Sequence, residues 1–241
     1  MNKYFDAENF FEANMIKDFN SEKFKKNTLA EIKMLQKYIP KSDAYILDVM
    51  CGYGRLGNEL YRLGYKNLSG IDIDTTSLIP EKRLFKFYNA DFYNWESPLL
   101  YEHCYSLYNS YTNFESFIDT INKCCLVLQK DGILIIDVFN KAWRDRLPNI
   151  THRVIKDNIE EKVELFRYYD GEYEKSIYKI TSNNQTKEFS YSQCVLSKEK
   201  LLNLIPNCWD ITITDSSVEN TRDDDQKNIL ILHEDPPTQY I

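Results

Sequence analysis

Basic residues and glycine are both scarce in this sequence. It has 30 lysines and arginines against 37 aspartates and glutamates, a net charge of −7, and seven glycines among 241 residues. Proteins that follow nucleic-acid phosphates need a clustered excess of basic side chains. The acidic balance therefore makes nucleic acid an unlikely partner.

The sequence also lacks a long apolar run and a cysteine motif. Its longest apolar stretch, residues 132–139, contains Asp137 and is too short to span a bilayer. The N-terminus carries acids early, unlike a signal peptide. The six cysteines have no CxxC spacing, which favours reduced thiols over disulfides or zinc. We expect a cytoplasmic protein with no membrane partner and no metal site.

Three of the few glycines lie close together behind a short apolar run. Residues 45–49 have the pattern of a buried strand, and residues 55–63 that of a helix with Gly64 as its C-terminal cap. Gly52 and Gly54 lie between the strand and the helix, and Gly57 lies within the helix. Strand, glycine turn and helix open a nucleotide-binding βαβ unit, in which backbone approaches a ligand closely.

Asp48 separates two possible ligands of this turn. The glycine spacing matches the dinucleotide fingerprint, but a carboxylate four positions before Gly52 would repel a pyrophosphate. S-adenosyl-L-methionine (SAM) has no phosphate and carries an ammonium and a sulfonium, which an acid attracts. The turn therefore favours SAM over NAD.

The segment Asp48–Arg55, DVMCGYGR, resembles the first motif of class I SAM-dependent methyltransferases, and closely that of a small-molecule subgroup. The resemblance covers roughly residues 25–235. It implies SAM as the cofactor, bound by Asp48, Met50, Gly52, Tyr53, Gly54, Arg55, Asp72, Ile73, Asp91 and Phe92.

Asp72 follows the second expected strand, within residues 68–74. It lies 18 positions after Gly54, about where such a unit delivers a carboxylate to ribose hydroxyls. Such a carboxylate makes charge-assisted hydrogen bonds. The resemblance assigns the ribose to Asp72 and the adenine face to Ile73, with Asp74 as the alternative acid.

Residues 84–88 are the expected third strand, and only about ten residues separate it from the second, where the family has a long helix. The following Asn89-Ala-Asp91-Phe92 resembles the motif that holds the adenine. By resemblance, Asp91 accepts the adenine amino group and the Phe92 backbone N–H meets the ring.

The remaining pattern predicts the fold class: α/β, a Rossmann-like seven-stranded, mostly parallel sheet with helices on both faces, plus an antiparallel β insertion after the fifth strand. The fourth strand, residues 101–107, is interrupted by polar residues. The SAM-binding domain is expected in residues 1–150 and 197–235, with helices before the first strand. The insertion is expected in residues 151–196, as a lid or a dimer interface.

Fewer sequence patterns indicate which residues would bind the acceptor of the methyl group. The segment 106–114 resembles the family's passage from the fourth strand into the active site, so Tyr108, Asn109 and Tyr111 are the candidate catalytic residues. His152 is the best placed of the three histidines for a base, although an exposed histidine at the start of the insertion is the favoured explanation. Aromatic faces suit a sulfonium through cation–π contact.

The resulting functional prediction is methyl transfer from SAM to a nitrogen or oxygen of a small polar metabolite. Two alternatives stay open: a peptide methyltransferase, and a SAM-binding partner or regulatory protein without transfer activity. The interrupted fourth strand motivates the second. A homodimer through the insertion is also open.

Overall fold

The computed structural model describes residues 22–40, 43–73, 83–107, 111, 114–141, 150–156, 159–170, 173–183, 185–204, 209–215 and 227–234. The predicted first helix around Phe10–Phe19 and the acids Asp223–Asp225 lie outside these residues.

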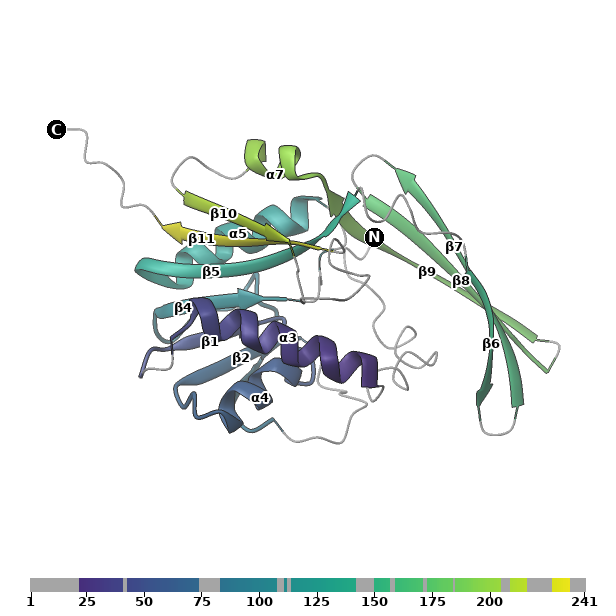
Figure 1. Cartoon of the computed structure of the whole chain (residues 1–241), viewed down its shortest axis with the longest axis horizontal. Helices are drawn as coiled ribbons and strands as arrows, with labels where there is room; N and C mark the ends of the chain where they lie inside the picture. The colour runs from purple at the N-terminus through teal and green to yellow at the C-terminus, as the bar shows by residue number, and fades with distance from the viewer. Residues whose placement is uncertain are drawn as a thin grey trace.

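A mostly parallel sheet forms the centre of the molecule (Figure 1). Its parallel strands are β1 (Ile46–Val49), β2 (Leu68–Asp72), β3 (Lys86–Asn89), β4 (Tyr101–Ser106) and β5 (Leu128–Asn140). They lie in the order β3-β2-β1-β4-β5, and β11 (Lys227–Glu234) and β10 (Trp209–Asp215) continue the sheet in antiparallel sense. The predicted seven-stranded sheet is confirmed, including its closing antiparallel pair.

The fourth strand is fully formed despite its polar residues. β4 lies between β1 and β5, with Glu102 and His103 half-buried near its start and Ser106 buried at its end. The Glu102 carboxylate accepts the Tyr45 N–H at 2.6 Å. Burial lowers the pKa of His103, whose Nδ1 has no hydrogen-bond partner among the described residues. The polar residues therefore do not prevent β4 from forming a central strand of the sheet.

β5 begins earlier than its apolar pattern indicates. A turn was expected at residues 130–132, but the strand runs through them with Asp131 at φ 63. Its pairing with β4 jumps from Tyr101↔Leu128 to His103↔Ile133. The expected turn is thus an irregularity within a longer strand.

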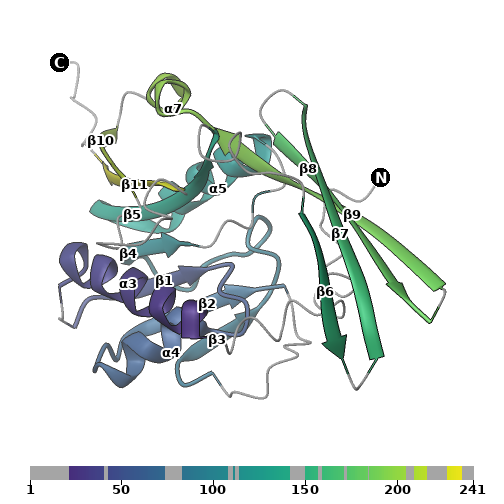
Figure 2. The same ribbon diagram turned by 45° about the vertical axis from the view of Figure 1, so that its right-hand side comes forward.

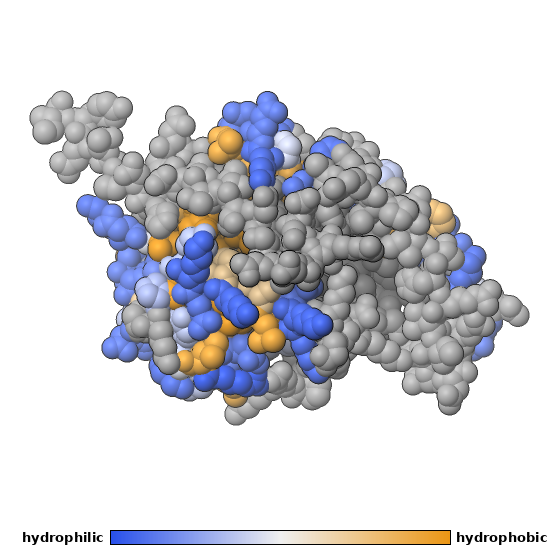
Figure 3. All heavy atoms as spheres, viewed as in Figure 1, coloured by the Kyte–Doolittle hydropathy of each residue, from blue (hydrophilic) through white to orange (hydrophobic). Residues whose placement is uncertain are grey.

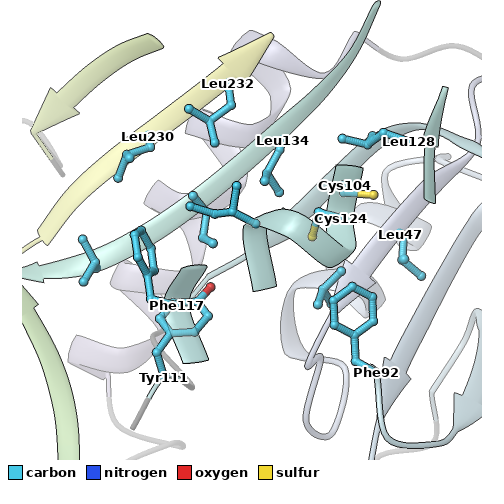
Figure 4. Packing of buried hydrophobic residues seen from close by; sticks show 14 of the residues in the cluster. Leu47, Phe92, Cys104, Tyr111, Phe117, Cys124, Leu128, Leu134, Leu230 and Leu232 are labelled. Atoms are coloured by element: carbon cyan, nitrogen blue, oxygen red, sulfur yellow. The ribbon is translucent and has the colours of Figure 1, made fainter. Parts of the chain in front are cut away.

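Helices cover both faces of the sheet (Figures 1 and 2). On one face lie α3 (Glu22–Tyr38) and α4 (Arg55–Arg62), whose buried side chains share a cluster with Ile46 and Ile135. On the other lie α5 (Phe114–Val127) and α7 (Lys198–Leu204), which pack with Leu134 and Leu230 (Figure 4). Alternate residues of a strand point to opposite faces, so one strand supplies both clusters.

Sequence signals fix two of the helix ends. Gly64 follows α4 with φ 100, and its N–H donates to the Tyr61 carbonyl at 3.0 Å. The Ser197 hydroxyl accepts the Lys200 N–H at 3.2 Å, which caps α7. The Gly64 cap was predicted from the residue type, and serine at residue 197 is likewise a preferred N-cap residue.

The region after β5 is a four-stranded antiparallel sheet of β6 (Ile150–Lys156), β7 (Ile159–Asp170), β8 (Tyr173–Ser182) and β9 (Gln185–Leu196). This confirms the predicted antiparallel insertion. Its strands are longer than expected, and the end of β9 pairs with β5 through Phe139↔Val195 and Asn140↔Leu196. All eleven strands therefore belong to one sheet, and β6–β9 extend from it on the side to which β4 and β5 point (Figure 2).

The described surface mixes polar and apolar residues. Figure 3 shows apolar residues between hydrophilic ones around α3, where Leu29 is 57% exposed. Scattered exposed apolar residues are normal for a globular protein. Within the described residues, no helix is long and apolar enough to cross a membrane, and no group of His, Cys, Asp and Glu side chains is arranged to hold a metal ion.

Candidate functional site

The turn after β1 reverses its backbone through left-handed conformations. Met50, Gly52 and Gly54 have φ of 55, 54 and 87. A side chain at Gly52 would meet no atom within 4 Å, so the backbone there borders open space. Gly52 is therefore the position where a ligand can approach the main chain.

The other two glycines of the motif serve packing. A Cβ at Gly57 would lie 2.3 Å from the Phe85 ring, and one at Gly54 would lie 2.9 Å from it. Gly70 in β2 meets the same ring, at 2.5 Å. Phe85, just before β3, thus packs on three glycines, and this is why α4 lies so close to the sheet.

Asp72, at the end of β2, is bound to the glycine turn. Its Oδ2 accepts the Gly52 N–H at 2.7 Å. The Asn89 side chain of β3 donates to the Asp72 and Ile73 carbonyls at 3.3 and 3.1 Å. Ile73 is 60% exposed. The predicted ribose acid and the predicted adenine-side residue are thus neighbours of Gly52 at the carboxyl edge of the sheet.

Arg83 also holds this turn, although no sequence signal pointed to it. Its Nε and Nη2 donate to the Gly52 carbonyl at 3.1 and 2.6 Å. The guanidinium lies 3.7 Å from the centroid of the Phe87 ring. Asp72 therefore binds the N–H of Gly52, and Arg83 binds its carbonyl. Together the two side chains fix the orientation of Gly52.

Asp48 is buried under the turn, with 5% exposure. Burial raises its pKa to about 7, because the charged form loses water. The Tyr105 hydroxyl, the Arg55 guanidinium and the Gly57 N–H act in the opposite direction. The Tyr105 hydroxyl nevertheless has no hydrogen-bond partner of normal geometry among the described residues.

Arg55 connects the turn to α3. Its Nη1 donates to the Thr28 hydroxyl at 2.9 Å and to a Glu31 oxygen at 2.5 Å. Both side chains of the ion pair are largely buried. This places Arg55 in the contact between α3 and α4, and its predicted role toward the cofactor stays a prediction.

The predicted adenine motif forms a turn after β3. The Asp91 carboxylate accepts the Tyr93 N–H at 3.1 Å and the Asn94 side-chain amide at 2.7 Å. The Phe92 side chain is buried in the core. Tyr53 is half-buried within the glycine turn. The adenine contacts proposed for Asp91 and Phe92 stay predictions.

The acceptor-side candidates are less well placed. Tyr108 and Asn109 lie outside the described residues, and His152 belongs to β6, where its backbone pairs with Val163. The Tyr111 hydroxyl donates to the Ser106 carbonyl at 3.3 Å. Its ring is 1% exposed and packs edge-on against Phe117 (Figure 4). This position favours a structural role for Tyr111, and its catalytic role stays a prediction.

Together these residues make a site that can hold a nucleoside with a cationic substituent. Asp72 presents a carboxylate beside exposed Ile73, and its negative charge favours a cation near the turn. In open α/β sheets, ligands bind at this carboxyl edge of the strands.

Comparisons with known proteins agree with this geometry. No family model and no curated protein sequence matches the chain. Solved structures, however, match it over nearly its whole length. A SAM-dependent methyltransferase from Clostridium acetobutylicum is 13% identical, with a TM-score of 0.67 over 96% of this chain and 100% of that one.

Two further structures extend the likeness. The sugar N-methyltransferase KedS8 from Streptoalloteichus is 15% identical, with a TM-score of 0.66 over 98% of this chain and 97% of its own. SAM-bound CalS10, an amino pentose methyltransferase from Micromonospora echinaspora, is 13% identical, with a TM-score of 0.63 over 97% of this chain and 99% of its own. This chain has the fold of the class I SAM-dependent methyltransferases.

Proposed function

We propose that this protein is a SAM-dependent methyltransferase that transfers a methyl group to a nitrogen or oxygen of a small polar metabolite. The observation that carries the proposal is the hydrogen bond from the Gly52 N–H to Asp72 at the open glycine turn, with exposed Ile73 alongside. This is the arrangement that ribose and adenine require.

The cofactor assignment depends on charge as well as shape. SAM would bring two cationic groups near the turn, where the Asp72 carboxylate lies and where a cation would favour the charged form of the Asp48 carboxyl. A pyrophosphate would meet the same carboxylates unfavourably. SAM and S-adenosylhomocysteine should therefore bind, and NAD should not.

The acceptor assignment rests on the surroundings of the carboxyl edge. The antiparallel sheet β6–β9 extends from it, and residues 151–196 would form a lid over a small substrate, with 1–150 and 197–235 as the cofactor-binding domain. A sugar N-methyltransferase and an amino pentose methyltransferase share this fold at low identity. The acidic protein also attracts cationic acceptors, so an amine is preferred over a hydroxyl.

Methyl transfer is a direct displacement on an already activated sulfonium. The protein must align the acceptor atom, the methyl group and the sulfur, and it must exclude water. Tyr108, Asn109 and His152 are proposed for the acceptor side, where an aromatic face would contact the sulfonium and an imidazole would accept a proton.

The test is a titration followed by a labelling experiment. Calorimetry should show binding of SAM and S-adenosylhomocysteine and no binding of NAD. Labelled SAM is then incubated with the protein and with separate small-molecule, peptide and RNA fractions of a cell extract. Label in the small-molecule fraction is the expected result.

Each other outcome favours a different class of protein. Label in the peptide fraction would replace the acceptor class with a peptide. SAM binding without label in any fraction would favour a partner or regulatory protein. Binding of NAD without SAM would refute the cofactor assignment.

A further inference from the structure

Three consecutive residues in front of β3 contact the glycine turn or the helix that follows it. The Arg83 guanidinium donates to the Gly52 carbonyl. The Leu84 N–H donates to the Asn58 side chain of α4 at 2.8 Å, and the Phe85 ring packs on the glycines of the motif. The chain therefore enters β3 along the glycine turn, and each of these residues can influence how the turn is held.

Backbone hydrogen bonds fix the two ends of the turn. The Cys51 N–H donates to the Ile71 carbonyl of β2 at 3.1 Å, and the Gly54 N–H donates to the Cys51 carbonyl at 2.9 Å. Gly52 lies between these bonds, with φ 54. Because glycine has the widest choice of φ and ψ, the orientation of the peptide groups on either side of its Cα depends on further contacts.

Two side chains supply those contacts at Gly52. The Asp72 Oδ2 accepts the N–H of the preceding peptide group at 2.7 Å. The Arg83 Nε and Nη2 donate to the carbonyl of the following peptide group at 3.1 and 2.6 Å. The N–H bond also orients the Asp72 carboxylate. A rotation of Gly52 that Arg83 prevents would therefore disturb Asp72 as well.

The Arg83 guanidinium is itself held in place. It lies 3.7 Å from the centroid of the Phe87 ring, and Phe87 pairs with Gly70 of β2. The Arg83 Cγ lies 3.2 Å from the position that a Cβ of Gly54 would occupy. A stacked planar guanidinium loses little conformational freedom when it donates hydrogen bonds. Arg83 is therefore pre-organised to hold the turn.

Arg83 could contribute to cofactor binding in two ways, which affect different parts of the cofactor. A direct ion pair would involve the carboxylate in the amino-acid portion of SAM. An action through Gly52 would involve the ribose, which the proposed function assigns to Asp72. The two hydrogen bonds to the Gly52 carbonyl favour the second way, because they use the guanidinium to orient the turn.

We propose that Arg83 is a positioning residue of the cofactor site: it holds Gly52, and through Gly52 the Asp72 carboxylate, in the orientation that binds the ribose. The inference rests on the proposed methyltransferase function and adds a residue to its cofactor site. It assigns no contact between Arg83 and the cofactor.

The experiment measures the binding of two adenosine ligands by calorimetry. S-adenosylhomocysteine contains the amino-acid portion of the cofactor, whereas methylthioadenosine lacks it and keeps the ribose and the adenine. Arg83→Met keeps an unbranched apolar stem and removes the donors. Because a hydrogen bond that orients the site is lost, it should weaken the binding of both ligands by a similar factor, about three- to tenfold.

Three further variants test how Arg83 acts. Arg83→Lys keeps the charge and a donor and should recover part of the affinity. Arg62→Met is the same change at an arginine of α4 that pairs with Glu59, and it should change neither affinity. In an Asp72→Ala background, Arg83→Met should weaken S-adenosylhomocysteine binding by less than about twofold, because residues that act through one another are not additive.

The outcomes separate this inference from the proposed function. If the wild-type protein binds neither ligand, the cofactor assignment fails and the inference fails with it. If the wild-type protein binds them and Arg83→Met leaves the affinities unchanged or higher, the positioning role is overturned while the methyltransferase proposal stands. A loss confined to S-adenosylhomocysteine would overturn it too, and would place Arg83 on the amino-acid portion. Full additivity with Asp72→Ala would likewise refute an action through Asp72.

Discussion

Asp48 in the parallel sheet and Glu174 in the antiparallel sheet are both buried carboxylates, but different parts of the chain surround them. Asp48 meets Tyr105 across the pairing of β1 with β4, and Arg55 and Gly57, seven and nine positions later in one strand–turn–helix unit. Glu174 meets Ser176 on its own strand and Gln193 across a hairpin, 19 positions away. Both carboxylates therefore depend on strand register, but at Asp48 the following turn and helix add further partners from the local sequence.

Removing the antiparallel sheet is the strongest test of whether cofactor binding and methyl transfer depend on different parts of the chain. We expect that replacing residues 151–192 by a flexible Gly/Ser linker abolishes methyl transfer and leaves S-adenosylhomocysteine binding largely intact. The replacement keeps Cys194, Val195 and Leu196, which are buried against the core. Calorimetry and the labelling assay measure the two effects.

Joint loss of folding and binding in that variant would show that the two sheets are one cooperative unit. The control is a variant in which the same Gly/Ser linker replaces only residues 171–172, between β7 and β8. It should retain both activities, because neighbouring strands still pair.

Phenylalanine truncation compares the packing of the two regions. Phe85→Ala should lower the free energy of unfolding by about 3–5 kcal/mol, because its buried ring packs on Gly54, Gly57 and Gly70. Phe166→Ala, on the exposed face of β7, should cost under about 1 kcal/mol. Urea unfolding measures both; equal losses would contradict the outer position of Phe166.

The sequence predicted the parallel region well because its signals are local. The glycine turn, the capping Gly64 and Ser197, and the apolar strands each depend on neighbouring residues. Arg83 was missed because a guanidinium that binds a carbonyl 31 positions away leaves no local pattern. The packing of Gly57 against Phe85 was not predicted for the same reason, since the two residues are far apart in the sequence.

The antiparallel region was predicted only in outline. Alternation and turn residues gave four strands, but not the pairing of β9 with β5 or the network around Glu174. Both depend on register, which no single strand encodes. Tyr111 was predicted as a catalytic residue from its position after β4; its ring packs in the core, and the catalytic role stays a prediction.

The pKa of Asp48 predicts how stability changes with pH. A carboxyl whose pKa rises from 3.8 to about 7 on folding binds its proton more tightly in the folded state. Wild-type stability therefore falls as pH rises from about 4 to about 7, and Asp48→Asn escapes this loss. The advantage of Asp48→Asn should grow by up to about 4 kcal/mol between pH 4 and pH 8.

Urea unfolding at several pH values measures this change. Glu188→Gln, at an exposed position of β9, is the control substitution. A difference between Asp48→Asn and wild type that stays flat over this pH range would mean that Asp48 is ionised throughout, and that the burial of the turn is less complete.

Asp72→Ala tests the cofactor side directly. It should weaken SAM binding by about 1.5–3 kcal/mol, roughly 10- to 150-fold, because charge-assisted hydrogen bonds to ribose are lost. The same substitution at Asp119, exposed on α5, should have no effect on binding. Calorimetry with S-adenosylhomocysteine gives the comparison; unchanged affinity in Asp72→Ala would move the ribose to another acid.

The smallest effect concerns the backbone of the glycine turn. Met50 has φ 55, a conformation that costs a residue with a Cβ about 1–2 kcal/mol. Met50→Gly and Met50→Ala both remove the half-buried side chain, so their difference isolates the backbone. Glycine is ordinarily the less stable of the two by about 0.5–1 kcal/mol. Here Met50→Gly should be more stable by about 1 kcal/mol.

The same pair of substitutions at Asn183, φ 50 after β8, should give the same sign, because the constraint there is also the backbone. Chemical denaturation of the four variants measures both differences. If Met50→Ala proves as stable as Met50→Gly while the Asn183 pair behaves as expected, the turn is not held left-handed at Met50. The alignment of Gly52 with Asp72 would then depend on Arg83 and the ligand instead of on the turn itself.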